Sequence, residues 1–230
     1  MNYLIILAGG IGSRIGGDIP KQYLNINGTP IIKLTLQSVD FSLFRKIVIV
    51  AATQWQEYIK ADILREYEPD IFLIAPAGES RQESILNGLL ALKQYAQEDD
   101  IVVIHDAARP NCEKKLFTKL IDTCIDVDGA MPVLPVKDTV YVSSNGGQSI
   151  TGLLNRNELF IGQSPEAYKF GHYLLINQQL NKEELAVIRG SSEIAYKNGL
   201  KIKLIEGDEM NFKISTPVDL ERFIEIIRRK

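Results

Sequence analysis

The sequence predicts an α/β fold, a mostly parallel sheet flanked by helices, and three observations support this prediction. Short apolar runs rich in β-branched residues alternate with stretches of helical apolar spacing along most of the chain. Such alternation is typical of parallel strands joined by crossover helices. A glycine-rich turn follows the first apolar run, and Asp106 ends a later one. Because open α/β sheets bind ligands at the carboxyl ends of their strands, we expect a ligand site there.

The apolar runs and helical stretches define the expected elements. The expected strands comprise residues 3–7, 46–52, 71–75, 101–105, 131–136 and 201–206, with a short extended piece at 212–214. The expected helices comprise residues 29–40, 55–67, 81–97, 114–125, 169–180 and 191–198, and a closing helix after Thr216-Pro217. Thr29 is expected to cap the first of these helices, Ser80 and Glu83 to form a capping box, and Gly199 to end the sixth helix.

Residues 137–160 form a different kind of segment. The stretch 139–143, the polar turn 144–147 and a second extended piece ending near 154 predict a β-hairpin. This hairpin has too few apolar residues to cover itself. Two interpretations stay open, an arm that packs on another subunit and an ordinary surface hairpin.

Length, charge and cysteine content limit the class of protein. A chain of 230 residues without a Pro/Ser-rich linker is expected to form one domain, residues 1–230. The net charge of −3 provides no basic field for nucleic acid. Cys112 and Cys124 match no metal or redox spacing and are interpreted as reduced thiols. The first apolar run is strand-length and no basic region precedes it, so we expect a cytoplasmic protein with no membrane partner.

The stretch from Leu7 to Gln22 predicts a phosphate-binding loop. It has glycines at positions 9, 10, 12, 16 and 17, which let backbone N–H groups approach phosphate oxygens closely. Ile15 breaks the G-x-G-x-x-G spacing of dinucleotide-binding turns, and no Gly-Lys-Ser or Gly-Lys-Thr ending of a P-loop is present. Arg14 and Lys21 add positive charge, which suits an enzyme that holds a triphosphate and neutralises charge developing on it.

Six motifs in order resemble one enzyme family over nearly the whole chain. They are LAGGIGSRIGGDIPKQY, GESRQESILNGL, IHDAARP, PVKDTV, GQSPEAY and NFKISTPVDL. Together they resemble the 2-C-methyl-D-erythritol 4-phosphate / ribitol 5-phosphate cytidylyltransferase family. The resemblance implies a Rossmann-like, glycosyltransferase-A-like nucleotidyltransferase fold with a protruding β-hairpin arm.

The resemblance also implies a reaction and its participants. A phosphate oxygen of a polyol phosphate attacks the α-phosphorus of CTP and expels pyrophosphate, with Mg²⁺ bound. Positioning and charge neutralisation supply most of the acceleration in such a transfer. A homodimer with shared active sites is implied, in which an arginine of the arm enters the partner subunit's site.

The implied site residues fall into three groups. Arg14, Lys21 and Lys213 match the catalytic cations, and Asp106 matches the magnesium ligand, by hard oxygen ligation typical of this metal. Ala8, Gly9, Gly10, Gly12, Gly78, Arg81 and Ser84 match the nucleotide-binding residues. Asp106, Arg109, Thr139 and Arg156 match the acceptor side, with Arg156 as the arginine of the arm. His105 is interpreted as a sheet residue, because attack by an ionised phosphate needs no strong base.

The chain departs from the family pattern at two places, and the second of them touches the acceptor pocket that the resemblance implies. Glu166 stands in Gln163-Ser164-Pro165-Glu166 where Gln-Thr-Pro-Gln is usual, and residues 190–193 stand where Thr-Asp is expected. The expected acceptor is 2-C-methyl-D-erythritol 4-phosphate of isoprenoid biosynthesis, and the alternative is D-ribitol 5-phosphate or a related pentitol phosphate of teichoic acid or capsule synthesis.

Two other classes also stay open. A non-catalytic nucleotide-binding module is disfavoured because the cations and Asp106 are all present. An NAD-dependent oxidoreductase is disfavoured because the second strand, ending Val50-Ala51-Ala52, is followed by no acid before Glu57.

Overall fold

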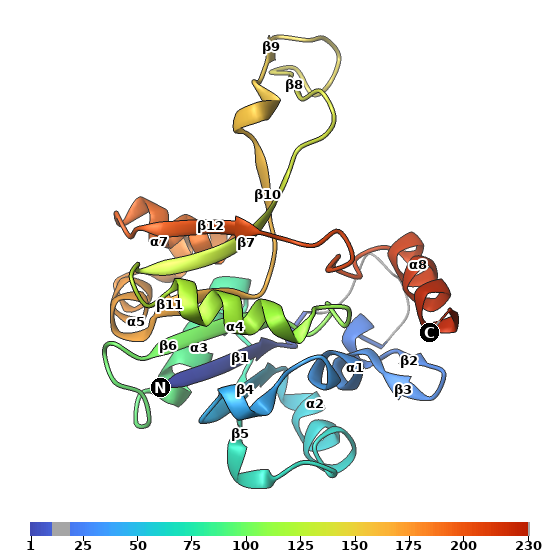
Figure 1. Cartoon of the computed structure of the whole chain (residues 1–230), viewed down its shortest axis with the longest axis vertical. Coiled ribbons are helices and arrows are strands. Elements are labelled where there is room, and N and C mark those ends of the chain that lie inside the picture. Colours follow the sequence, from blue (N-terminus) through green and yellow to red (C-terminus); the bar gives the residue numbers. More distant parts are fainter. Residues whose placement is uncertain (11–18, 230) are drawn as a thin grey trace.

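One central sheet organises the molecule, seen in a computed structural model that describes residues 1–10 and 19–229 (Figure 1). Within these residues its order is β10-β7-β11-β6-β1-β4-β5, with β12 paired to β7. The strands are β1 (Asn2–Leu7), β4 (Lys46–Ala51), β5 (Phe72–Pro76), β6 (Ile101–Asp106), β7 (Gly129–Pro135), β10 (Phe160–Gly162), β11 (Glu166–Lys169) and β12 (Ile202–Glu206). The pairs β6-β1, β1-β4, β4-β5 and β7-β12 are parallel, so the expected α/β class is confirmed.

Helices cover both faces of the sheet (Figure 1). They are α1 (Ile31–Gln37), α2 (Thr53–Tyr58) with a π-helical continuation (Ile59–Ile63), α3 (Arg81–Leu92), α4 (Lys114–Thr123), α5 (Phe170–Gln178), α6 (Lys182–Val187), α7 (Ser191–Lys197) and α8 (Pro217–Arg228). Leu4 and Ile6 of β1 pack with α1 and α4, whereas Tyr3 and Ile5 pack with α3, α5 and α7. Alternate residues of the strand therefore fill two cores, as expected of a sheet buried on both faces.

Two strands next to β6 and β7 were not expected from the sequence. β11 runs antiparallel to β6, with Glu166 opposite Ile104, and β10 runs antiparallel to β7. They insert antiparallel pairs into the otherwise parallel sheet, and β11 begins beside the carboxyl end of β6. The helix α6 was also not expected.

The prediction of a helix capped by Thr29 is wrong at its start. Thr29-Pro30 is strand β3, which pairs with β2 (Asn25–Ile26) around Asn27 and Gly28, both at positive φ, and α1 begins at Ile31. Two residues with φ > 0 form a tight hairpin turn, so this local signal defines a hairpin and not a helix cap.

Most helix caps are those that the sequence predicts. Ser80 caps α3 and accepts a hydrogen bond from Glu83 N, but the Glu83 carboxylate accepts from Glu79 N, so the reciprocal half of the expected box is absent. Thr216 and Asp219 form a full capping box on α8, and Gly199 has φ of 77° after α7. The helices α3 and α4 end at Leu92 and Thr123, before the expected residues 97 and 125.

The segment between β7 and β10 leaves the body of the molecule as an arm (Figure 1). The expected hairpin is present, but its strands are only β8 (Tyr141–Val142) and β9 (Gly152–Leu153). No residue from 137 to 162 is buried. Among the described helices, none is long and apolar enough to cross a membrane.

Candidate active site

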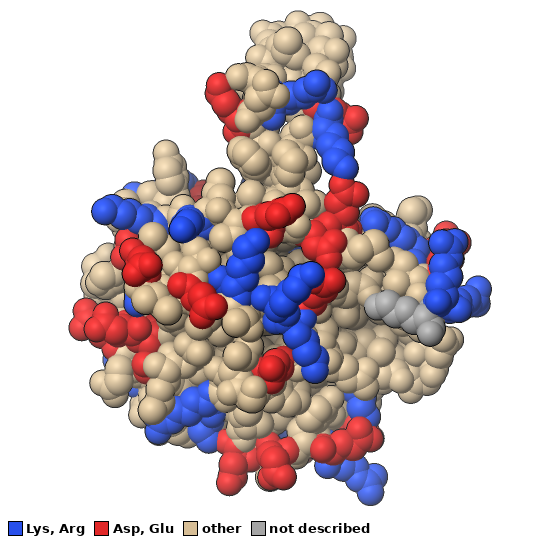
Figure 2. Space-filling model, in the orientation of Figure 1, with Lys and Arg blue, Asp and Glu red and all other residues tan. Residues whose placement is uncertain are grey.

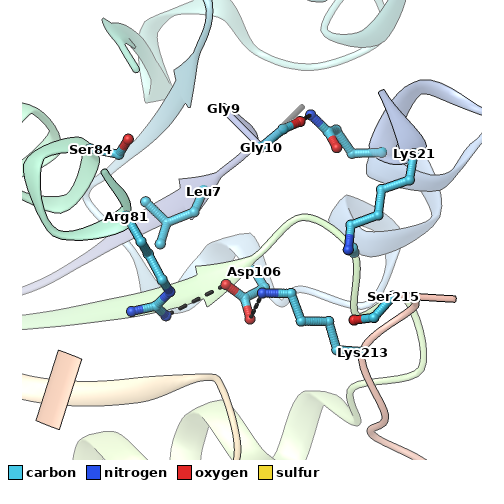
Figure 3. Close-up of a pocket in the computed structure, with 11 residues that line it drawn as sticks. Leu7, Gly9, Gly10, Lys21, Arg81, Ser84, Asp106, Lys213 and Ser215 are labelled. Carbon is cyan, nitrogen blue, oxygen red and sulfur yellow. Dashed lines mark hydrogen bonds and ion pairs between the residues drawn. The ribbon is translucent and has the colours of Figure 1, made fainter. Parts of the chain in front are cut away.

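Three cationic side chains converge on the carboxylate of Asp106 at the end of β6. Figure 3 shows two of them, Arg81 and Lys213. Lys213 Nζ lies 3.1 Å from Oδ2, Arg109 Nε lies 3.4 Å from the same oxygen, and Arg81 Nη2 lies 3.5 Å from Oδ1. Asp106 is only 6% exposed. The cations come from separate segments of the chain, so the fold itself assembles this charge cluster.

Backbone contacts explain why Lys213 and Arg109 reach this carboxylate. Ile214 N donates to Ala108 O at 2.9 Å, which pins the C-terminal segment to the loop after β6. Arg109 Nη1 donates to Asn211 O at 2.6 Å, and the Asn211 amide donates to Ser164 O at 2.8 Å. The segment after β12 is therefore tied to the end of β6 at several points.

Burial and neighbouring charges act in opposite directions on the pKa of Asp106. Burial alone would raise its pKa, but Lys213, Arg81 and Arg109 outweigh burial and hold the pKa well below its usual range. The side chain is therefore an anion at neutral pH. Burial also lowers the pKa of neighbouring His105 to about 3, so this imidazole is neutral there.

A cavity of about 250 Å³ lies between the glycine turn after β1 and the Asp106 cluster (Figure 3). It is lined by Leu7, Gly9, Gly10, Lys21, Gln22, Arg81, Ser84, Asp106, Ala108, Lys213 and Ser215. Six residues expected at the catalytic or nucleotide site are thus together in one cavity: Gly9, Gly10, Lys21, Arg81, Ser84 and Lys213. We call it the first pocket.

Close packing shapes the glycine wall of the first pocket. A Cβ on Gly9 would lie 2.4 Å from Ala77 Cβ, so only glycine fits against the turn after β5. Ser84 Oγ accepts from Gly78 N at 3.0 Å and donates to Ser80 O at 2.9 Å. Ser84 is therefore a fixed part of the wall and not a solvated helical serine.

Gln22 is a further residue of this wall that the sequence did not single out. Its buried amide donates to Ala8 O at 2.6 Å and to Gly10 O at 2.8 Å. Two carbonyl groups of the turn are therefore satisfied by one side chain. The Ala8 carbonyl also accepts from the Tyr23 hydroxyl at 3.1 Å.

A second cavity, of about 230 Å³, adjoins the first and we call it the second pocket. Arg81, Asp106 and Lys213 line both. Its other lining residues are Arg109, Met131, Gly162, Gln163, Ser164, Glu166, Arg189, Gly190 and Ser192. Arg109, expected on the acceptor side, is here, while Glu166 and Arg189 were not among the expected site residues.

Six expected site residues are not seen to line either pocket. Ala8 and Gly78 lie behind the wall of the first pocket, where Ala8 O accepts from Gln22 and Gly78 N donates to Ser84. Arg14 and Gly12 lie outside the described residues. Thr139 and Arg156 are exposed residues of the arm, and Arg156 Nη1 donates to Lys137 O at 3.0 Å. Within one chain, therefore, the fold does not bring these two arm residues to the pockets.

The donor chemistry of Asp106 fits a magnesium ion. An ionised carboxylate is a hard oxygen ligand, and Mg²⁺ is commonly held by one or two carboxylates together with substrate phosphates and water. The described residues contain no cluster of three or more His, Cys, Asp or Glu side chains that could hold a metal by themselves. A metal here would therefore depend on phosphate oxygens of the substrate.

The sheet and its two joined pockets, one walled by glycine backbone and both by cations, define an α/β nucleotidyltransferase. Residues 2–229 match the family described as IspD: 2-C-methyl-D-erythritol 4-phosphate cytidylyltransferase, and the chain belongs to this family. It is 34% identical over 217 residues to 2-C-methyl-D-erythritol 4-phosphate cytidylyltransferase of Clostridium beijerinckii, covering 94% of this chain and 93% of that protein.

Solved structures show the same fold. The 2-C-methyl-D-erythritol 4-phosphate cytidylyltransferase of Francisella tularensis matches with a TM-score of 0.78 at 26% identity, over 96% of this chain and 97% of that one. The 4-diphosphocytidyl-2C-methyl-D-erythritol synthase of Anaerococcus prevotii matches with a TM-score of 0.80 at 22% identity, over 99% and 98%. The family assignment agrees with the expectation of a cytidylyltransferase and not with an oxidoreductase or a non-catalytic module.

Proposed function

We propose that the chain joins CTP to 2-C-methyl-D-erythritol 4-phosphate, giving the CDP-linked polyol and pyrophosphate for isoprenoid biosynthesis. The observation that carries this proposal is the shared wall of the two pockets. Arg81, Asp106 and Lys213 line both, so a nucleotide in the first and an acceptor in the second would meet at these charges. The family assignment favours this acceptor over D-ribitol 5-phosphate.

The reaction requires the protein mainly to position the two substrates and to neutralise the negative charge that develops on the phosphates. An oxygen of the acceptor phosphate forms a bond to the α-phosphorus of CTP, and the bond from that phosphorus to the pyrophosphate oxygen breaks. Lys213 and Lys21 would counter the charge that develops, with Arg14 as a third catalytic cation. Magnesium, held by Asp106 and phosphate oxygens, would supply further charge neutralisation when bound.

No general base is needed for this step. The attacking phosphate is already ionised at neutral pH, so no proton has to be removed from it. His105, although next to Asp106, is fully buried and touches Ser164 Oγ through Nδ1 at 3.0 Å. Its part is to support the end of β6, where Asp106 N also donates to Ser164 Oγ at 2.9 Å.

The turn after β1 and the start of α3 would hold the cytidine. Residues assigned to this role are Ala8, Gly9, Gly10, Gly12, Gly78, Arg81 and Ser84. Support comes from the close packing of Gly9 on Ala77 and from Ser84, which fixes Gly78. Backbone groups held this rigidly can select a base edge by hydrogen bonding.

The arm would complete the acceptor site in a homodimer. Its exposed apolar side chains, Tyr141, Val142, Ile150, Leu153, Leu154, Phe160 and Ile161, suit burial against a second copy of the chain. Figure 2 shows few charges over the end of the arm. We assign Thr139 and Arg156 to the partner subunit's acceptor site, and a cytoplasmic location to the enzyme, whose two cysteines are buried and free.

A pyrophosphate-release assay tests the proposed function. The wild-type protein is given CTP with magnesium and, in separate reactions, 2-C-methyl-D-erythritol 4-phosphate, ribitol 5-phosphate or xylitol 5-phosphate. Release with the first acceptor at a kcat/KM well above the others is expected. Equal or faster release with a pentitol phosphate would overturn the acceptor, and equal use of ATP, GTP or UTP would overturn the choice of nucleotide.

A further inference from the structure

Glu166 is a buried carboxylate beside the pockets that the proposed mechanism does not use. It is the first residue of β11, only 6% exposed, and it lines the second pocket. Glu166 Oε1 accepts from Ser191 Oγ at 2.6 Å and lies 3.8 Å from Arg81 Nη2, and Oε2 accepts from the Tyr168 hydroxyl. The fold therefore provides several partners for this buried carboxylate. Burying a carboxylate without such partners is costly.

Ser191 joins the same group from another element. It is the first residue of α7 and is fully buried. Ser191 Oγ accepts from Arg81 Nη1 at 2.8 Å, and Ser191 O accepts from the Tyr173 hydroxyl at 3.0 Å. Arg81 is therefore held by β6 through Asp106, by β11 through Glu166 and by α7 through Ser191.

Glu166 changes the balance of charge around Asp106. Without it, Arg81, Arg109 and Lys213 would share one carboxylate. With it, Arg81 has a second anion. The Arg81 guanidinium is thus shared between two buried carboxylates, with Nη2 at 3.5 Å from Asp106 and 3.8 Å from Glu166.

Glu166 and Ser191 come from separate elements and lie in contact. Ser191 Oγ donates to Glu166 Oε1 at 2.6 Å. Glu193, the other acid near the start of α7, is occupied elsewhere, because it accepts from Arg189 N at 3.0 Å and pairs with Lys197 Nζ at 2.6 Å. Two buried groups in direct contact are expected to depend on each other.

We propose that Glu166 is a positioning residue, which acts with Ser191 to hold the Arg81 guanidinium in the wall shared by the two pockets. The inference rests on the proposed function, because Arg81 is assigned there to the nucleotide. Glu166 acts through Arg81 and not by contact with the reacting atoms. Its effect should therefore depend on where a carboxylate stands relative to Arg81, and not on residue 166 alone.

A charge-exchange cycle tests this dependence. Glu166→Gln keeps the size of the side chain but removes the anion, and kcat/KM for CTP should fall about tenfold. Ser191→Asp alone places a second carboxylate against Glu166 and should also lower kcat/KM. In the double variant the new carboxylate stands where Ser191 Oγ now meets Arg81, and kcat/KM should return to within about threefold of wild type.

The cycle distinguishes a role of Glu166 in positioning Arg81 from a role in packing alone. Losses that multiply in the double variant, or full activity in Glu166→Gln, would overturn the proposal. Glu166→Asp, which keeps the charge at a shorter reach, should retain more activity than Glu166→Gln, and equal loss in both would also overturn it. The comparison of Glu166→Asp with Glu166→Gln tests the proposal even if Ser191→Asp does not fold.

Two controls keep this result distinct from the proposed function. Glu183→Gln removes an exposed carboxylate from α6 and should leave kcat/KM unchanged. The wild-type protein is assayed in parallel with CTP and 2-C-methyl-D-erythritol 4-phosphate. An inactive wild type would refute the proposed function, whereas an active wild type without the exchange effect would refute only the role of Glu166.

Discussion

The end of β6 and the arm both carry residues that the sequence motifs single out, but one chain fixes the surroundings of only the first set. Asp106 is 6% exposed and meets three cations from separate segments. Thr139 and Arg156 are exposed, in a segment with no buried residue from 137 to 162. A sheet can position a charge cluster by itself, whereas within one chain the two arm residues stay exposed to solvent.

Removal of a cation from the cluster should have the largest effect. Lys213→Ala should lower kcat by about 10²- to 10³-fold, because a preorganised charge that stabilises the transition state is lost. Pyrophosphate release measures the effect. Lys93→Ala, an exposed lysine at the end of α3, is the matched control and should retain wild-type kcat. Loss of kcat below tenfold in Lys213→Ala would contradict the catalytic role.

Removal of the arginine of the arm should have a smaller effect that crosses between subunits. Arg156→Ala should lower kcat/KM about tenfold, as expected for one charge-assisted hydrogen bond to an acceptor. When Arg156→Ala protomers are mixed with Lys213→Ala protomers, activity should be regained, because each mixed dimer has one site in which both Arg156 and Lys213 are intact. Lack of recovery in mixed dimers isolated with two affinity tags would show that Arg156 acts only within its own chain.

Alanine substitutions at two strand glycines would compare how tightly the body and the arm are packed. A Cβ on Gly129 of β7 would lie 2.7 Å from both Ile202 Cδ1 and Tyr168 Cδ1, whereas one on Gly152 of β9 would meet Val142 Cβ at an ordinary 3.5 Å. Gly129→Ala should lower the free energy of unfolding by about 1–3 kcal/mol, and Gly152→Ala should change it by less than about 0.5 kcal/mol. Urea unfolding measures both, and equal effects would contradict the contrast.

The pH dependence of stability should also originate in the body. Burial lowers the pKa of His105 from 6.5 to about 3, so below pH 6.5 the unfolded chain takes up a proton that the folded chain does not. Burial of neutral His105 therefore costs no stability above pH 6.5, and the free energy of unfolding declines as the pH falls from 6.5 toward 3. His105→Asn should flatten the decrease in unfolding free energy between about pH 6.5 and 4.5. His172→Asn, an exposed histidine of α5, is the control and should leave that slope closer to wild type.

The parts of the fold that the sequence predicted depend on local signals. β1, β4 and β6 are mostly apolar runs, and each begins and ends within a residue or two of the expected bounds. Asp106 could be found because it directly ends such a run. Thr216 is followed by Pro217 and Asp219, a cap that needs no tertiary contact.

The parts that were missed depend mostly on distant partners. β11 has four residues and exists because it pairs with β6, far earlier in the chain. Glu166 was seen only as a departure from a motif, since nothing local shows that Arg81 and Ser191 would reach it. Two misses did have local signals: the Asn27-Gly28 turn of the β2-β3 hairpin and the Asn181–Glu184 capping box of α6.

The wall that belongs to both pockets has a consequence for inhibition and release. Arg81, Asp106 and Lys213 line both pockets, so under the proposed function a molecule in which cytidine and polyol are already linked through a diphosphate would span both at once. Such a molecule loses overall translational freedom once instead of twice. The reaction product has this form, so its departure is a natural candidate for the slow step, and non-hydrolysable analogues of it should outcompete mimics of either substrate alone.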